Sequence, residues 1–484
     1  MQDLLSQLMQ NPKAEEEKNV ISEKKNNKAY EKDLQAIREE LIRIHGDSIK
    51  NIISERNAKE KLKGFITSLV NEKFPEYREK KDVERIYQDI FGFSFINDYI
   101  ADLDFEEMNG NAWNDIEVLT NYGYKKLDTS FNSPEHAKNI IKKMMAIGNA
   151  ILNEADPTLD SFIGTGLRLT ASIYPVIDED VGVTFSLRKL AGKEISVRDL
   201  VEKYDSYSYE EIDFIETCLK HGVSVLFGGA TSSGKTSDMQ TIVKRVTEDG
   251  KLRAFCIEEN TRELDFIHKN RDGKILSRVI HTKTVESKNT DKLKVDSDLL
   301  VKTSLRYHPD IIIPAEMRGG EALSAVESAL TGHTIVSSAH IQSVTKAYER
   351  LLMLCQKANQ SISEDMLMSI IVEAIPIVVF KKYFKEDRSR RCLKIFEATG
   401  YNKDKKKIEG QILYKFVRKE IDEDGKVLGD HAKINPPSFK LCQKFYENGC
   451  PLEEVNQFNS SFSVSLTDDY VEDFIDITTK EEDR

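Results

Sequence analysis

The chain has 484 residues, enough for two to four domains, and its hydrophobic fraction of 39% can build cores beneath a surface rich in charge. The formal net charge of −12 argues against a duplex DNA or RNA scaffold, because neutralising phosphates takes clustered Lys and Arg. No stretch approaches the roughly 18 consecutive apolar residues of a membrane-spanning helix. The longest candidate, 370–380, is interrupted by Glu373 and Pro376.

Two further features bear on the compartment. Residues 1–10 lack the basic region and the long apolar core of a signal peptide. The six cysteines are scattered without the spacing of a zinc site or a redox motif. We therefore expect a reduced, cytosolic compartment.

The first part of the chain changes character near residue 30. Residues 1–30 are dominated by Lys, Glu and Asn, which predicts a solvated, mobile arm. Apolar side chains then recur at helical spacing from Leu34 to Ile44, and again over 83–90. We expect a helical extension over 31–90, whose apolar stripe packs on its own chain or docks a partner.

A mixed α/β pattern follows over 91–190. Ser133 and Pro134 predict a helix start with proline at the first helical position. Two segments, 167–174 and 183–188, alternate apolar and polar residues as strands do. On these strands Arg168 and Arg188 point away from the apolar face, so they belong to a solvated face or to a binding site.

The next element carries the most specific motif of the sequence. An apolar run over 223–227 predicts a buried strand, and a helical pattern extends over 236–248. Between them lies a complete G-x-x-x-x-G-K-[ST] phosphate-binding loop, GATSSGKT, at 229–236. Its backbone N–H groups and the following helix N-terminus suit phosphate oxygens. Lys235 would supply charge for the β and γ phosphates, and Thr236 a hydroxyl ligand for Mg²⁺.

Beyond this loop, apolar strands alternate with helical or irregular stretches, which predicts a mostly parallel sheet covered on both faces. The expected strands are 252–257, 311–313, 334–338 and 375–380. The charged stretch 269–296 is typical of a surface excursion. A hairpin with a turn at 402–407 is expected over 392–417, and an acidic, loosely ordered tail over 468–484.

Acidic and histidine residues follow several of these strands. Glu258 and Glu259 end the strand after the phosphate-binding loop. The run Ile311 to Glu316 has the form of a Walker B element, and Arg318 follows it. Thr331-Gly332-His333 precedes a strand that leads to His340.

In the order of these motifs the sequence resembles the secretion-system ATPases of type IV secretion, type II secretion and pilus assembly, nearest the Tad/Flp pilus and conjugation branch. The family's Walker A, acidic box, Walker B and histidine box occur here in sequence, and the resemblance covers about residues 90–420. It implies a RecA-like P-loop domain with a mostly parallel sheet, preceded by a smaller α+β domain that is PAS-like.

The resemblance also implies roles for single residues. Glu258 matches an acidic-box glutamate that orients or activates water. Glu316 matches the Walker B acid, which contacts the metal and the water. His340 matches a histidine that senses the γ-phosphate, and Arg318 is implied to belong to the same catalytic group. Arg168 and Arg188 resemble arginines that close over the nucleotide. The residues implied to bind ATP and Mg²⁺ are Gly229, Thr231, Ser232, Ser233, Gly234, Lys235, Thr236 and Ser237, with Thr236 and Glu316 at the metal.

Departures from the family leave alternatives open. Pro314 and Ala315 stand before the Walker B acid where the family has glycine, and Glu259 stands where it commonly has Asp. The expected function is an ATP-hydrolysing ring motor, a hexamer working with integral membrane platform or channel proteins at the inner face of the membrane. The alternatives are a nucleic-acid translocase and an ATP-binding scaffold with little turnover. The net negative charge disfavours direct nucleic-acid binding, and a small-molecule kinase would leave the upstream domain unexplained.

The expected organisation begins with an arm (1–30), a helical extension (31–90) and an α+β domain (91–190). A linker (191–207), the ATPase domain (208–425) and a C-terminal extension (426–484) follow.

Overall fold

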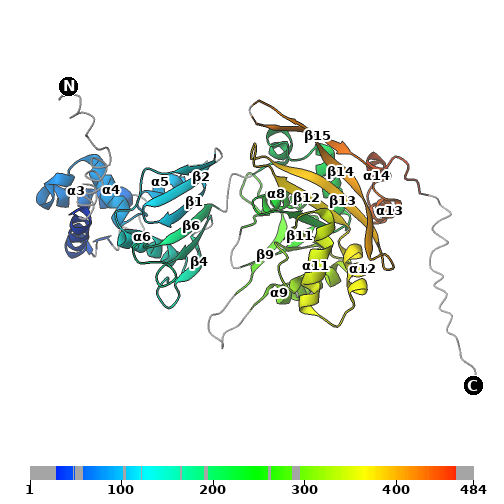
Figure 1. Ribbon diagram of the computed structural model, residues 1–484, viewed down its shortest axis with the longest axis horizontal. Helices are drawn as coiled ribbons and strands as arrows, with labels where there is room; N and C mark the ends of the chain where they lie inside the picture. Colours follow the sequence, from blue (N-terminus) through cyan, green and yellow to red (C-terminus); the bar gives the residue numbers. More distant parts are fainter. Residues whose placement is uncertain are drawn as a thin grey trace, which may run out of the picture. The chain divides into compact units, whose positions relative to one another are not determined.

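A computed structural model describes residues 29–46, 48–49, 58–101, 105–120, 123–163, 166–189, 195–259, 263–285, 295–423 and 425–464. The chain divides into two compact units, Met1–Lys193 and Glu194–Arg484 (Figure 1). Almost all of the predicted arm over 1–30 and the whole predicted tail over 468–484 lie outside the described residues.

The first unit begins with helices that enclose a core of their own. They comprise a helix over 29–46, α3 (Ala58–Lys73), the 3₁₀ turn η1 (Pro75–Tyr77), α4 (Lys80–Ile90) and α5 (Ile96–Ala101). Ile37 and Leu41 of the predicted stripe are buried against Ile66 and Ile86, whereas Ile44 is exposed. Most of the stripe therefore packs on its own chain.

A six-stranded antiparallel sheet completes this unit, in the order β3-β2-β1-β6-β5-β4. Its core includes Ile140 and Met144 of helix α6 (Pro134–Ile147) together with Leu169 and Leu187 of the sheet. The two strands expected around Arg168 and Arg188 are β5 and β6. The strands are β1 (Phe105–Ala112), β2 (Asp115–Thr120), β3 (Gly123–Lys126), β4 (Thr158–Ile163), β5 (Leu167–Ser172) and β6 (Thr184–Lys189).

The second unit is built on a nine-stranded sheet, in the order β15-β14-β13-β12-β7-β11-β10-β8-β9. The six neighbouring strands β12-β7-β11-β10-β8-β9 are parallel to one another. Strands β13, β14 and β15 extend the sheet on the β12 side with antiparallel pairs. They are β7 (Val225–Gly229), β8 (Arg253–Glu258), β9 (Arg278–Lys283), β10 (Ile311–Pro314), β11 (Thr334–His340), β12 (Ile377–Tyr383), β13 (Arg390–Asn402), β14 (Lys407–Ile421) and β15 (Val427–Lys433).

Helices cover both faces of this sheet, as the predicted mixed α/β fold requires (Figure 1). Val225 and Phe227 of β7 belong to one core, and Leu226 belongs to the other, because successive side chains of a strand point to opposite faces. One core contains side chains of α7 (Tyr209–Lys220), α8 (Lys235–Val246), α13 (Phe439–Glu447) and α14 (Leu452–Phe458). The other contains side chains of α9 (Ser297–Ser304), α10 (Glu321–Leu330), α11 (Val344–Ala358) and α12 (Glu364–Ala374).

Three segments differ from their sequence-based expectation. The stretch 269–296, expected to be a surface excursion, contains the edge strand β9, whose polar side chains suit an edge that is only partly buried. The expected boundary at 426 falls beside β15, which pairs with β14 within the sheet. The expected linker 191–207 contains a short π-helical turn, Asp199–Lys203, and places Leu200 and Tyr207 in the core of the second unit.

Candidate functional site

The predicted site residues of the second unit gather at one edge of its sheet. The strands β7, β11, β10 and β8 are parallel neighbours, so their carboxyl ends meet at the same edge. His340 lies opposite Gly229 in the register of β11 and β7, and Glu316 bridges to Ser338. The predicted phosphate-binding loop, the predicted Walker B acid Glu316 and His340, which are far apart in the sequence, are thereby brought together.

The loop between β7 and α8 has the backbone that its glycines permit. Gly229 has a φ of 155°, and a Cβ there would lie 2.4 Å from the carbonyl oxygen of Lys381. Gly234 has a φ of 87° and immediately precedes α8. Any other residue at either position would strain the loop or displace its neighbour.

Lys235 reaches back over this loop. Its Nζ donates to the carbonyl oxygens of Gly229, at 3.0 Å, and Ala230, at 2.8 Å. Burial lowers the pKa of Lys235, and the carboxylate of Glu316 opposes that shift. The lysine ammonium is therefore held at the mouth of the loop, beside the N-terminus of α8, where an anion would bind.

The remaining polar side chains of the loop divide into two groups. Ser233 is buried and its hydroxyl donates to the carbonyl oxygen of Ala230 at 2.8 Å, so it supports the turn. The other group has side chains that are exposed to solvent, where a ligand can reach them. Its members are Thr231, Ser232, Thr236 and Ser237. These exposed hydroxyls and the half-buried carboxylate of Glu316 at the same sheet edge offer the hard oxygen ligands that Mg²⁺ prefers.

A network of charged side chains follows β10. Glu316 Oε1 lies 3.2 Å from His340 Nε2, and its Oε2 accepts a hydrogen bond of 2.6 Å from Arg318 Nη2. Arg318 Nη1 donates to Glu259 Oε2 at 3.1 Å. Arg318 thus joins the acids that follow two neighbouring strands. Burial lowers the pKa of His340, and the nearby charge of Lys235 lowers it further, which favours the neutral imidazole.

The backbone that carries Arg318 is held by Glu321, a positioning residue absent from the predicted site. Glu321 Oε1 accepts hydrogen bonds from the backbone N–H groups of Arg318, at 2.7 Å, and Gly319, at 2.8 Å. A carboxylate at the start of α10 also suits the positive end of that helix. The spacing from Glu316 to Glu321 could have indicated this role.

Glu258 has different surroundings from Glu259. Its side chain is 4% exposed, and its Oε1 accepts hydrogen bonds from the backbone N–H groups of Glu263, at 2.7 Å, and Leu264, at 2.8 Å. Its Oε2 lies 4.0 Å from His281 Nδ1. In the described contacts Glu258 anchors the chain that leaves β8, while Glu259 contacts Arg318.

A second set of charged residues lies next to the phosphate-binding loop, since Lys381 is opposite Gly229 in the register of β12 and β7. Asp238 of α8 is buried, with Lys381 Nζ at 2.6 Å and the Tyr207 hydroxyl donating to it at 2.8 Å. Lys381 Nζ also lies 4.6 Å from the centroid of the Tyr207 ring. Nothing in the local sequence pattern indicates that residues so far apart would meet.

Arg390 contacts the loop directly. Its Nε donates to the carbonyl oxygen of Ser232 at 2.9 Å, and its side chain packs against Gly234, where a Cβ would lie 3.3 Å from Arg390 Cδ. The residue opens the long strand β13, outside every motif that the sequence displays. It places a second cation beside the phosphate-binding loop.

Arg168 and Arg188 belong to the first unit, where they face each other across β5 and β6. Arg168 Nη2 lies 3.3 Å from Asp160 Oδ2, and its guanidinium lies 5.7 Å from the centroid of the Phe162 ring. Arg188 is exposed. Both side chains are on the polar side of their strands, as the alternation predicts.

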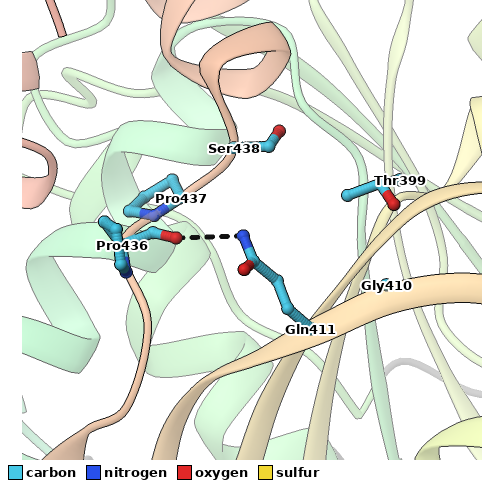
Figure 2. A pocket seen from close by; sticks show the side chains of 6 residues that line it. All are labelled: Thr399, Gly410, Gln411, Pro436, Pro437 and Ser438. Carbon is cyan, nitrogen blue, oxygen red and sulfur yellow. Dashed lines mark hydrogen bonds between the residues drawn. The ribbon is translucent and has the colours of Figure 1, made fainter. Parts of the chain in front are cut away.

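The second unit has two surface hollows, one away from the candidate site and one that borders it. The first, of about 390 Å³, lies between β14 and the segment before α13, where Gln411 Nε2 donates to the carbonyl oxygen of Pro436 at 3.0 Å (Figure 2). The second, of about 580 Å³, includes Glu259 and Glu321. The described lining of neither hollow includes a residue of the phosphate-binding loop.

Among the residues that the structure describes, every helix is too short or too polar to cross a bilayer.

Comparison with known proteins identifies the family. The profile described as "Type II/IV secretion system protein" matches residues 161–404, half of the chain. The chain belongs to the type II/IV secretion system protein family. The match begins in β4 and ends just after β13, so it includes Lys235, Glu316 and His340. This confirms the resemblance inferred from the order of the motifs.

Individual relatives of this secretion-family chain are distant. An uncharacterized protein of Methanocaldococcus jannaschii is 25% identical over 290 residues, which cover 60% of this chain and 48% of the relative. The chain thus spans about half the length of that relative. The conjugal transfer protein TrbB of Rhizobium radiobacter is 24% identical over 261 residues, covering 53% of this chain and 73% of TrbB.

The structure of this family member is also similar to a solved one. The X-ray structure of the Legionella pneumophila ATPase DotB aligns with 62% of this chain and 78% of DotB, at 18% identity and a TM-score of 0.45. A score of this size does not assign the fold, which rests on the strand order described above.

Proposed function

We propose that this protein hydrolyses ATP as a ring motor that powers pilus assembly, conjugation or protein secretion through a membrane apparatus. The observation that carries the proposal is that the loop containing Lys235 lies at the same sheet edge as the linked side chains of Glu316, Arg318 and His340. Phosphoryl transfer depends mainly on positioning and on neutralising charge over the γ-phosphate oxygens, and this edge concentrates the groups that do so.

Each residue has a proposed task. The backbone of residues 229–236, Lys235 and the N-terminus of α8 bind the phosphates. Thr236 and Glu316 would hold Mg²⁺, which when bound neutralises phosphate charge. Glu316 and one of the two adjacent acidic-box residues, Glu258 or Glu259, orient the attacking water. His340 senses the γ-phosphate. Arg318 keeps the carboxylates of Glu259 and Glu316 in place.

The wider assembly is part of the same proposal. The second unit serves as a RecA-like ATPase domain, and the antiparallel sheet of the first unit as a PAS-like domain that brings Arg168 and Arg188 to the nucleotide. A hexamer would complete each site, and integral membrane platform or channel proteins would hold it at the cytoplasmic face of the membrane. The Tad/Flp pilus and conjugation apparatuses are the preferred settings.

The direct test is ATP hydrolysis by the purified chain with Mg²⁺, then with excess chelator, then with Mg²⁺ restored. Hydrolysis that disappears with the chelator and returns with Mg²⁺ supports the proposal. Stimulation by single-stranded or duplex DNA would favour a nucleic-acid translocase instead. Tight nucleotide binding without turnover would favour an assembly scaffold.

Separate Glu→Gln substitutions at positions 258 and 259 are expected to have different effects. Glu259→Gln weakens the contact with Arg318, so we expect kcat to fall about 10-fold or more while the unfolding midpoint stays unchanged. Glu258→Gln alters a buried acceptor of two N–H groups, so we expect a loss of about 1–3 kcal/mol in the free energy of unfolding. Steady-state kinetics and denaturant titration of both variants separate these outcomes. A larger fall in kcat with Glu258→Gln than with Glu259→Gln, at unchanged stability, would assign the water-orienting role to Glu258 and not to Glu259.

Arg390→Ala is expected to raise the KM for ATP about 10-fold, because the loop loses both its anchor at Ser232 and a nearby cation. The neighbouring Arg388→Ala is the control, since Arg388 is exposed and has no described contact with the loop. KM is measured from initial rates over an ATP series. Equal KM values for the two variants would rule out a role for Arg390 in nucleotide binding.

A further inference from the structure

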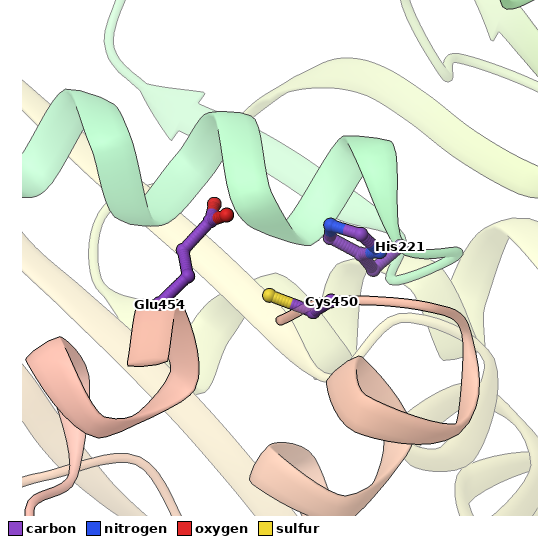
Figure 3. A group of neighbouring side chains, drawn as sticks. All are labelled: His221, Cys450 and Glu454. Carbon is purple, nitrogen blue, oxygen red and sulfur yellow. The ribbon is translucent and has the colours of Figure 1, made fainter. Parts of the chain in front are cut away.

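Three potential metal ligands meet near the amino end of β7, whereas the phosphate-binding loop follows its carboxyl end. His221 follows the last turn of α7 just before β7, Cys450 precedes α14, and Glu454 lies on α14. One ligand atom from each lies within 4.8 Å of the other two, and Figure 3 shows the side chains converging between the two helices. Cys450 is 2% exposed, and the other two are half-buried.

A neighbouring carbonyl group fixes the tautomer of the His221 imidazole. Its Nδ1 lies 2.9 Å from the carbonyl oxygen of Asn448, which can only accept a hydrogen bond, so Nδ1 carries the proton. Asn448 Nδ2 in turn donates to the carbonyl oxygen of His221 at 3.0 Å. Nε2 is left with its lone pair. A histidine ligand whose other ring nitrogen donates to a backbone carbonyl is the usual arrangement at protein metal sites.

The carboxylate of Glu454 also has a supporting contact. The single hydroxyl proton of Thr217 is shared between Glu454 Oε1, at 3.2 Å, and the carbonyl oxygen of Asp213 within α7, at 2.8 Å. This contact draws one oxygen of Glu454 toward α7, beside His221. Two of the three candidate ligands are therefore positioned by neighbouring groups.

We propose that His221, Cys450 and Glu454 form a site for a divalent cation of the zinc class, which fastens α14 to the end of α7. A thiolate, an imidazole and a carboxylate are the donors that Zn²⁺ takes in proteins, and three protein ligands leave a fourth position for water. Zinc bond lengths put tetrahedral ligand atoms about 3.3–3.8 Å apart, so from separations within 4.8 Å the side chains need to close by at most about 1.5 Å. Coordination converts the Cys450 thiol to a thiolate and releases its proton to solvent.

The test uses the full chain, stripped of metal with a chelator and titrated with Co²⁺ as a spectroscopic probe. We expect one equivalent to give thiolate-to-cobalt charge-transfer absorption, and Zn²⁺ to displace it. The absorption should vanish in Cys450→Ser and persist in Cys442→Ser, which removes another buried thiol of the same region. Absorption that persists in Cys450→Ser and vanishes in Cys256→Ser would overturn the proposal, because it would place the metal beside Glu258 and His281.

Two milder variants keep the proposal testable if Cys450→Ser does not fold. Glu454→Gln should lower Zn²⁺ affinity at least 10-fold in a chelator competition. Thr217→Val, which removes the supporting hydroxyl, should lower it about 10-fold. Unchanged Zn²⁺ affinity in both variants would contradict the site. None of these readouts depends on ATP hydrolysis, so the metal site and the proposed motor stand or fall separately.

Discussion

Lys235→Ala is expected to lower kcat for ATP hydrolysis by about 10³-fold or more, the largest effect of any single change that we predict. In the structure the ammonium of Lys235 bridges two carbonyl oxygens of the loop and is held near Glu316. No other described side chain both lies within the loop and carries a full positive charge. The substitution removes a positive charge from the place where negative charge develops on the γ-phosphate oxygens in the transition state.

The matched control is Lys251→Ala, which removes a lysine whose side chain is 84% exposed and paired with Asp249 beyond α8. Wild type, Lys235→Ala and Lys251→Ala are compared by single-turnover hydrolysis and by thermal unfolding. We expect Lys251→Ala to match wild type in both measurements. A Lys235→Ala protein that folds and hydrolyses ATP within a few-fold of wild type would remove the basis of the proposed site.

Lys381→Met is expected to lower the free energy of unfolding of the second unit by about 3–5 kcal/mol, because it leaves Asp238 buried without its cation. Methionine retains the length of the side chain, so the effect reports charge rather than volume. Asp238 also accepts a hydrogen bond from Tyr207, which remains in the variant. Denaturant titration of the second unit measures the loss, with the exposed neighbour Lys382→Met as control.

The same variant should change how stability depends on pH. Burial raises the pKa of Asp238, and Lys381 opposes that rise, so removing the lysine raises the pKa further. An acid whose pKa is higher in the folded than in the unfolded state holds its proton more tightly when folded. Both proteins should lose stability as the pH rises above the unfolded pKa of about 4, but Lys381→Met should continue to lose it above the pH at which wild type levels off, because its folded pKa is higher. A pH profile parallel to that of wild type would show that the pair does not control the ionisation of Asp238.

The parallel strands could be predicted because each is a short apolar run with a clear end. Ile311 to Ile313 and Val225 to Phe227 are fully buried, as their β-branched and aromatic side chains require. Once such strands are parallel neighbours, residues just after them must share an edge. That rule brings together Gly229, Glu316 and His340, which the sequence alone separates by many residues.

The elements that could not be predicted lack this local signal. Strand β1 contains two glutamates, two asparagines and a glycine, and β9 at the sheet edge has no fully buried side chain. The pairing of Lys381 with Asp238 joins distant parts of the chain, and no periodicity records such a contact. The contrast between Glu258 and Glu259 depends on which of them meets the N–H groups of Glu263 and Leu264 and which meets Arg318, and two adjacent acids in a sequence cannot reveal that.

The central claim is that ring assembly completes a hydrolytic site in which Glu316 acts. The most direct measurement is ATP hydrolysis over a series of protein concentrations, with molar mass from light scattering, for wild type and Glu316→Gln. We predict that wild-type activity per subunit rises as the mass approaches that of a hexamer, and that Glu316→Gln forms the same ring, binds ATP and hydrolyses it at least 100-fold more slowly. Activity that is independent of assembly, or that survives in Glu316→Gln, would contradict the account.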